Sequence, residues 1–278
     1  MKYIIKKIVS DIPKYIFLIL VLISILVPIY FMMMTSVKSH DEYLVNKLNP
    51  PRKLTLENYR GIFFEQKFLR LMYNSMRITL ASGILCVTVS TLAAFAFANY
   101  NFPLKNLLYV TILSLMSVPP IVMIIPLFVQ FVQFKIIGNP IGAIIIYVGL
   151  TIPFSVYLLT SFFRTAPNEL REAAKIDGCS DLKYFTHIIL PLSKPAIATC
   201  FIVNSVWVWN ELLIALIFLQ KDELRTLMAG IMLKIGKFQV NVPLVTSGLV
   251  VASLPMIILF LVFQKWFIRG LVEGAIKG

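Results

Sequence analysis

The sequence predicts an all-α membrane protein with six transmembrane helices, and three observations lead to that fold class. Hydrophobic residues make up 59% of the 278 residues and charged residues only 14%. The mean hydropathy is +0.85, far above that of soluble domains. Six segments stay mostly apolar for about 20 residues, the length at which a helix crosses a bilayer. These apolar runs also assign the net charge of +13 to loops at a membrane surface and not to nucleic-acid binding.

The first apolar segment, residues 15–35, follows Lys2, Lys6 and Lys7 and resembles a signal peptide at first sight. It is longer than the roughly 7 to 15 apolar residues of a signal peptide, and no A-x-A cleavage pattern follows it. We therefore expect an uncleaved first transmembrane helix. The other predicted spans, all within a single transmembrane domain 1–278, are 72–98, 106–133, 140–163, 196–219 and 245–268.

The side of the membrane follows from the number of spans and from the N-terminal lysines. An even number of spans places both termini on one side, and basic residues before the first span place that side in the cytoplasm. Loops 38–71 and 220–243 are then extracytoplasmic, and loop 164–195 is cytoplasmic. The chain is thus predicted to be a multi-pass protein of the plasma membrane.

Prolines interrupt two of the predicted spans. Pro119, Pro120 and Pro126 lie in the third and Pro153 in the fourth, and each removes a backbone donor and clashes with the preceding turn. Such breaks are common along the transport paths of membrane proteins, where neighbouring groups satisfy the freed carbonyls. A plain structural kink explains them equally well.

The cytoplasmic loop carries the signals of two short helices. Pro167 suits the start of the first, and Gly178 suits the left-handed residue that ends it. Ser180 is placed to cap the second helix, which we expect Pro191 to end.

Small residues on the first of these helices suggest a docking surface. Leu170, Ala173 and Ala174 share a face at the i, i+3, i+4 spacing, and alanines allow a partner to approach closely. A helix that merely lies among lipid headgroups would carry larger apolar residues there.

The same loop resembles the EAA loop of permease subunits of ABC importers. Glu172-Ala173-Ala174, then Gly178, then Ile188-x-Leu190-Pro191 match its order and spacing without a gap. The resemblance is to the carbohydrate branch, in particular the smaller permease of the maltose importer type, and it extends over nearly the whole chain. The further matching segments are LTLENYRGIF (54–63), YNSM (73–76), VPP (118–120), WNE (209–211) and RGLVEGAIKG (269–278).

This resemblance implies the fold of a type I ABC importer permease in the inner membrane of a prokaryote, and it implies partners. They are a second permease, two ATPases that hold the ATP and Mg²⁺, an extracytoplasmic sugar-binding protein, and membrane lipid. In that family the EAA loop forms a coupling helix that contacts the ATPase. The residues implied for this contact are Glu172, Ala173, Ala174, Asp177, Gly178, Leu190 and Pro191.

Two other segments have family roles that compete with simpler explanations. The tail with Lys277 and Gly278 is implied to reach between the ATPases, whereas its glycines also fit a frayed terminus. The loop 220–243 is implied to enter the cleft of the binding protein through Lys237, Gln239 and Asn241. A passive connector fits that loop equally well.

The fifth predicted span contains Asn204, Trp207, Asn210 and Glu211. Asn204, Trp207 and Glu211 share one helical face, and an ionisable group within a bilayer faces the bundle interior or a polar path. An aromatic ring beside hydrogen-bonding groups is the chemistry that binds sugars. This face therefore either lines the translocation path or forms a hydrogen bond between helices.

The sequence offers no catalytic residues, no metal site and no nucleotide site of its own. The segment 230–238 approaches a Walker A motif but has an extra residue between its glycines and no Ser or Thr after Lys237. Two histidines and three unpaired cysteines form no metal-ligand pattern. We expect a sugar or oligosaccharide permease; a polyamine or amino-acid ABC permease and an ion-driven secondary transporter are the alternatives.

Overall fold

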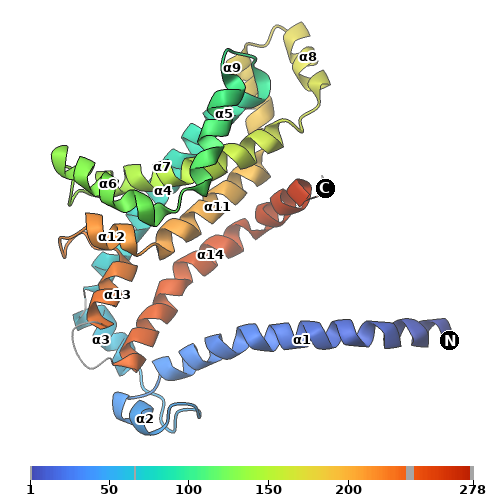
Figure 1. Ribbon diagram of the computed structural model, residues 1–278. Coiled ribbons are helices and arrows are strands. Elements are labelled where there is room, and N and C mark those ends of the chain that lie inside the picture. The colour runs from blue at the N-terminus through green and yellow to red at the C-terminus, as the bar shows by residue number, and fades with distance from the viewer. Residues whose placement is uncertain (1, 66, 236–240, 276–278) are drawn as a thin grey trace. The chain divides into compact units, whose positions relative to one another are not determined.

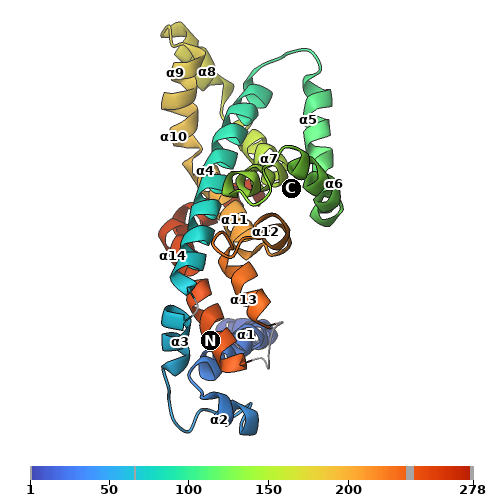
Figure 2. The ribbon, with the colours of Figure 1, turned by 90° about the vertical axis from the view of Figure 1, so that its left-hand side faces the viewer.

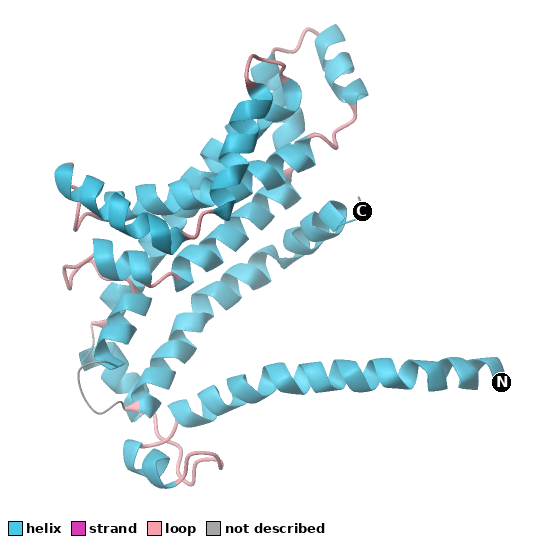
Figure 3. Ribbon diagram, in the orientation of Figure 1, coloured by secondary structure: helices cyan, strands magenta, loops and turns pink. Residues whose placement is uncertain are grey.

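The computed structural model describes residues 2–65, 67–235 and 241–275, which form helices and loops and contain no strand (Figure 3). The all-α prediction is thereby confirmed. The elements are α1 (Lys2–Ser36), α2 (His40–Val45), α3 (Glu57–Glu65), α4 (Phe68–Asn99), α5 (Lys105–Ser114), the 3-10 helix η1 (Leu115–Ser117), α6 (Pro120–Gln133), α7 (Pro140–Phe163), α8 (Asn168–Ile176), α9 (Asp181–Tyr184), the π-helix η2 (Phe185–Ile189), α10 (Leu190–Leu192), α11 (Lys194–Asn210), α12 (Leu213–Phe218), α13 (Leu227–Ile235) and α14 (Val242–Ala275) (Figure 1).

Four of these helices are long and apolar enough to cross a membrane, and two bent helix pairs raise the number to six if each pair counts as one span. The four are Asp11–Ser36 within α1, α4, α7 and Val242–Trp266 within α14. They coincide with the first, second, fourth and sixth predicted spans. The apolar window of the first is 0% buried by the described part of the chain, so this helix needs lipid or another protein to cover it.

The third predicted span is bent by 103° between Lys105–Ser117 and Pro120–Gln133. Val118 adopts an extended conformation with ψ 114°, as expected of a residue that precedes proline. Pro119 also has an extended ψ of 130°, and Pro120 starts α6. Pro126 and Pro153 lie inside α6 and α7. A pair of prolines therefore ends the helix here, whereas single prolines remain within helices.

The fifth predicted span, 196–219, is not one helix. α11 ends at Asn210, and Glu211 has an extended ψ of 130° before α12 begins. The second bent pair instead joins Asp181–Leu192 to Lys194–Asn210 at 72°. Hydropathy did not predict this break, because apolar residues lie on both sides of Glu211. The carboxylate of Glu211 caps α12.

The chain divides into two compact units, and the first comprises Met1–Phe68 and Leu233–Leu254. A polar network ties the end of α1 to the loop that follows. Lys38, only 1% exposed, donates from Nζ to the carbonyls of Asn46 and Lys47 at 2.9 and 3.2 Å. The amide of Asn58 donates to the carbonyls of Ser36 and Lys38 at 2.9 and 2.7 Å. These bonds satisfy buried polar groups that would otherwise be costly.

The second unit comprises Leu69–Met232 and Pro255–Gly278, and α7 and α11 pack together within it. One apolar cluster joins α6, α7 and α12 around Tyr147 and Phe218. Another joins α4, α7, α8, α9, η2 and α11 around Phe95 and Phe185. α8 and α9 extend beyond the end of α4 (Figure 2), and the second cluster connects the cytoplasmic loop predicted from the sequence to the long helices.

Candidate functional site

The predicted cytoplasmic loop folds into a short exposed helix, α8, that ends as its sequence predicts. Gly178 has a φ of +71°. The N–H of Gly178 donates to the carbonyl of Lys175 at 3.1 Å, and the N–H of Cys179 donates to that of Ala174 at 2.8 Å. These are the two bonds of a Schellman C-terminus. Pro167 occupies the N-cap position, one residue before the position expected for it.

The two neighbouring alanines of α8 face in different directions, which corrects the shared docking face expected for Leu170, Ala173 and Ala174. Ala174 is 5% exposed and packs in the cluster around Phe95, whereas Leu170 and Ala173 are exposed. Consecutive helical residues lie about 100° apart, so only one of the two alanines faces the rest of the chain.

The outer surface of α8 is open over most of its length. Glu172, Ala173, Asp177 and Gly178 are all exposed, and Ile176 is 87% exposed. The surface formed by these five residues is called the α8 surface below.

The helix after Gly178 starts where predicted and continues further than predicted. Ser180 Oγ accepts from the N–H of Lys183 at 3.3 Å and caps α9. The prediction that Pro191 ends this helix is wrong, because α10 continues through it to Leu192. The π-helix η2 directly precedes α10. Its wider turns change which carbonyl each N–H meets, so the donor that Pro191 lacks interrupts the helix less. Leu190 is half-buried and packs against the Phe95 cluster, whereas Pro191 is exposed.

Arg171 fastens α8 to the end of α4. Its Nη1 donates to the carbonyl of Asn99 at 2.5 Å, and its guanidinium lies 5.6 Å from the ring centroid of Tyr100. The Tyr100 ring meets Phe95 edge to face at 5.7 Å, and Phe95 lies 4.7 Å from Phe185. These contacts continue from α8 through the end of α4 into η2.

Tyr100 has a further partner in Asp181 at the start of α9. Burial raises the pKa of Tyr100 above its usual 10.0, and the hydrogen bond and charge of Asp181 raise the pKa further, against the effect of Arg171. The contact between Arg171 and Tyr100 was not predicted from the sequence, because no local pattern relates residues so distant along the chain.

Asn204 on α11 lies in a buried contact between helices. It is 3% exposed, and its Nδ2 donates to Ser155 Oγ at 2.8 Å and approaches Cys86 Sγ at 3.4 Å. These three side chains come from α11, α7 and α4. Asn204 therefore forms a hydrogen bond between helices, which was one of its two interpretations from the sequence.

Glu211 lies at the break between α11 and α12 and uses both carboxylate oxygens within the chain. It accepts from Tyr147 Oη at 2.9 Å, from the N–H of Ile214 at 3.0 Å and from that of Ala215 at 3.2 Å. Trp207 is 37% exposed and meets the Tyr147 ring edge to face at 6.1 Å. Asn210 is exposed and donates to the Val206 carbonyl of its own helix at 2.7 Å.

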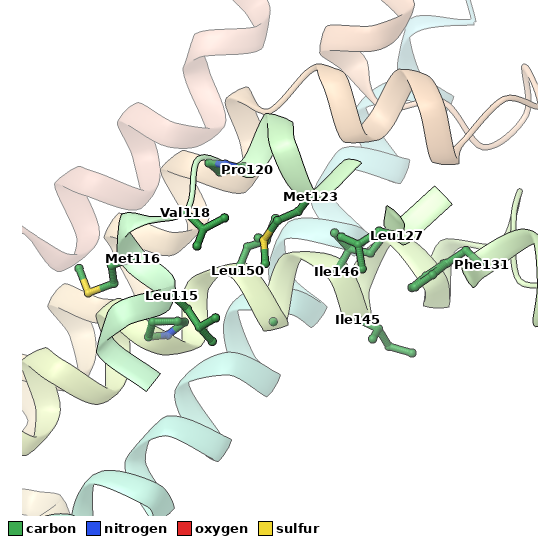
Figure 4. A pocket seen from close by; sticks show the side chains of 12 residues that line it. Leu115, Met116, Val118, Pro120, Met123, Leu127, Phe131, Ile145, Ile146 and Leu150 are labelled. Carbon is green, nitrogen blue, oxygen red and sulfur yellow. The ribbon is translucent and has the colours of Figure 1, made fainter. Parts of the chain in front are cut away.

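An apolar pocket of about 360 Å³ lies between η1 and α6 on one side and α7 on the other (Figure 4). Its lining is formed by Leu115, Met116, Val118, Pro120, Met123, Leu127, Phe131, Ile145, Ile146, Gly149, Leu150 and Pro153. None of these side chains has a hydrogen-bonding group that could hold a sugar hydroxyl. The pocket is therefore a poor candidate for a sugar site.

The other predicted residues are placed in part. Asn241 Oδ1 accepts from the N–H of Leu244 at 3.1 Å and caps α14. Lys237, Gln239, Lys277 and Gly278 lie outside the described residues. Within the described ranges, no group of three His, Cys, Asp or Glu residues is arranged to hold a metal ion.

Sequence comparison relates most of this chain to membrane components of transport systems. The family model described as "Binding-protein-dependent transport system inner membrane component" matches residues 86–273, a range that includes α8 and α11. A putative ABC transporter permease of Caldicellulosiruptor sp. is 38% identical over 91% of this chain and 92% of its own length. The melibiose/raffinose/stachyose import permease of Bacillus subtilis is 34% identical over 91% of each chain.

The fold has a counterpart among solved structures. A chain of a bacterial ABC transporter involved in the import of the acidic polysaccharide alginate aligns with a TM-score of 0.83 at 20% identity, over 94% of this chain and 98% of that chain. The same kind of transporter in complex with an alginate pentasaccharide-bound periplasmic protein aligns with a TM-score of 0.69 over 94% of this chain and 95% of that chain.

Proposed function

The chain belongs to the family of binding-protein-dependent transport system inner membrane components, and from this premise we propose that it is a permease subunit of an ATP-driven importer of a sugar or oligosaccharide. The observation that carries the proposal is the family match across α8 and α11. The sugar specificity is supported by relatives named for melibiose, raffinose and stachyose, for arabinooligosaccharides and for trehalose.

The importer is proposed to contain a second permease, two ATPases that bind ATP and Mg²⁺, and an extracytoplasmic sugar-binding protein. The binding protein is supported by the alginate transporter complex that includes a periplasmic protein. The second permease is supported by α1, whose apolar window is 0% buried by the described part of this chain. This chain then supplies half of the translocation path.

The α8 surface is proposed to contact the ATPase. Ile176 is 87% exposed and would supply the apolar part of the contact, with Glu172 and Asp177 beside it. Movement of the ATPase would pass inward through two attachments, namely Ala174 in the Phe95 cluster and Arg171 on the Asn99 carbonyl. Both attachments lead to α4, so a displacement of α8 would pull on a long apolar helix.

Contact of the α8 surface with the ATPase would place α8 in the cytoplasm and would thereby set the orientation of the chain. Both termini are then cytoplasmic, and loops 38–71 and 220–243 are extracytoplasmic. The loop 220–243, with Lys237, Gln239 and Asn241, is proposed to meet the binding protein, and the tail with Lys277 and Gly278 to meet the ATPases. Trp207 and Asn210 remain the side chains of α11 proposed to face the translocation path, because both have exposed surface.

Co-purification of the ATPase with Gly178 variants tests the coupling role. Gly178→Arg and Gly178→Ala both place an L-residue at a φ of +71°, at a similar backbone cost of about 1–2 kcal/mol. Apart from the two residues next to Gly178 in the chain, no described atom lies within 4 Å of the added Cβ, so the Cβ that both variants share has room. The two variants therefore share the backbone cost and differ in the bulk and the positive charge that they present to a partner.

We expect the ATPase to co-purify with the wild type and with Gly178→Ala but not with Gly178→Arg, and sugar uptake to follow the same order. Glu172→Arg, which reverses a charge on the same surface, is expected to behave like Gly178→Arg. Wild-type uptake by Gly178→Arg would refute the coupling role. A folded wild-type chain that recovers no ATPase would refute the proposed function altogether, and a binding protein that prefers polyamines or amino acids would refute only the sugar assignment.

A further inference from the structure

A polar pocket lies where the ends of three helices of the second unit meet. α4 ends at Asn99, α5 begins at Lys105, and Arg164 follows the last residue of α7. The pocket has a volume of about 390 Å³, and its polar lining comes from Asn101, Lys105, Asn106 and Arg164. It is a separate site from the α8 surface and from the apolar pocket beside Pro120.

The charge of this pocket is wholly positive. Lys105 and Arg164 line it together with two amides, and no acidic residue belongs to its lining. Among the described residues, the salt bridge present joins Arg225 to Asp222 and involves neither cation. Two cations that share a pocket without a carboxylate repel each other, and an anion between them removes that repulsion.

Both cations are held in place by contacts that leave donors available. Lys105 Nζ donates to the Tyr100 carbonyl at 2.6 Å, and an ammonium group has three donors. The Arg164 guanidinium lies 5.3 Å from the ring centroid of Tyr109, and a guanidinium has five N–H donors. The first turn of α5 adds backbone N–H groups, because no side chain caps this helix at Leu104.

The surroundings favour a lipid over a free anion. Leu104, Leu107 and Val110 on the adjoining turns of α5 are 67%, 60% and 62% exposed. In a bilayer these leucines and this valine face acyl chains, while the pocket lies at the end of α7, at the depth of headgroups. A phosphate in the pocket would thus be attached to acyl chains that cover the exposed face of α5.

We propose that this pocket binds the phosphate of an anionic phospholipid, with Lys105 and Arg164 as the charged ligands. The proposal depends on the membrane setting of the chain and is independent of the transported solute. Basic pockets between transmembrane helices are suited to anionic headgroups, and arginine forms strong charge-assisted bonds to phosphate.

Native mass spectrometry of the full-length chain, titrated with dioleoyl phosphatidylglycerol or dioleoyl phosphatidylcholine, tests this. We expect the chain to prefer phosphatidylglycerol, and the double variant Lys105→Gln/Arg164→Gln to bind it roughly tenfold more weakly or worse, since charged hydrogen bonds are lost. The control Lys175→Gln/Lys183→Gln removes equal charge from exposed positions on α8 and α9 and should bind like the wild type.

Equal affinity of the wild type and the Lys105/Arg164 variant for phosphatidylglycerol would overturn the proposal. So would equal binding of the two lipids by the wild type. Displacement of the lipid by an equal concentration of glycerol phosphate would show an anion site without a lipid preference, which overturns the lipid assignment.

A measurement on the wild-type chain keeps the test valid if the double variant fails to fold. The chain is placed in vesicles of either lipid, and acylation of Lys105 by an amine-reactive ester is compared with that of Lys183 in the same sample. The ratio corrects for the surface potential that both lysines experience. We expect this ratio to fall severalfold in phosphatidylglycerol, and an unchanged ratio would contradict the proposal.

Discussion

Replacement of Arg171 by alanine is expected to loosen α8 from the end of α4 without unfolding the protein. The substitution removes the hydrogen bond to the Asn99 carbonyl and the contact with the Tyr100 ring. A hydrogen bond from a charged donor contributes about 1.5–3 kcal/mol, and a partly exposed cation–π contact adds about 0.5–1 kcal/mol. We take the lower end, about 2 kcal/mol, because the freed carbonyl becomes hydrated.

A loss of about 2 kcal/mol changes the ratio of attached to detached α8 by roughly 30-fold. Amide hydrogen exchange reports on this ratio, because a helix of nine residues that is released from α4 is marginally stable and exposes its amides. We expect peptides that cover 168–177 to exchange faster by about that factor in Arg171→Ala, with little change in peptides of α7. Sugar-stimulated ATPase activity of the assembled importer should fall in parallel.

Two comparisons separate this attachment from a general effect on the helix. Lys175→Ala removes an exposed cation from the same helix and should leave exchange nearly unchanged, because alanine has a high helix propensity. Tyr100→Leu combined with Arg171→Ala forms a double-mutant cycle, in which we expect a coupling of about 1 kcal/mol. Unchanged amide exchange of α8 in Arg171→Ala would show that Arg171 does not hold α8 on the end of α4.

Three polar side chains that are hydrogen-bonded within the chain give further predictions. Asn204→Ala removes the bond to Ser155 Oγ and is expected to destabilise the membrane-embedded fold by about 1–2 kcal/mol; thermal melting in detergent measures this, and unchanged stability with altered sugar selectivity would instead favour a role in the path. Glu211→Ala removes the cap of α12 and leaves the hydroxyl of the buried Tyr147 unpaired, so we expect a loss of about 2–4 kcal/mol; Tyr147→Phe should cost only about 1 kcal/mol, and melting curves that rank the two variants in the opposite order would contradict the capping role. Lys38→Met leaves two carbonyls without their donor and should lower stability by about 2–3 kcal/mol, with faster proteolysis of the 38–56 loop as the readout; an unchanged cleavage rate would show that the bonds do not hold this loop.

Local chemistry explains which features could be predicted from the sequence. Apolar runs long enough to span a bilayer became α1, α4, α7 and α14, because lipid requires every backbone group to be satisfied within the helix. Gly178 ends α8 in the left-handed conformation and Ser180 caps α9, because such ends depend on one or two residues. The paired prolines likewise break the third span wherever its neighbours lie.

Tertiary structure decided the roles of residues whose partners are distant in the sequence. Whether Ala173 or Ala174 faces outward depends on the rotation of α8 about its axis. The Phe95 cluster determines this rotation, together with the hydrogen bond from Arg171 to Asn99, which lies 72 residues away in the sequence. The sequence was compatible with Asn204 lining the translocation path or forming a hydrogen bond between helices. The structure shows its amide bonded to Ser155 Oγ on α7.

Glu211 is a second residue whose role depends on a partner distant in the sequence. Hydropathy placed it inside a continuous span, whereas its carboxylate instead caps α12 and accepts from Tyr147 on α7. The lengths of the apolar segments, the turns and the family motif can thus be predicted from the sequence, since they depend on neighbouring residues. The pairing of polar side chains cannot, because it depends on packing between helices that the one-dimensional pattern does not encode.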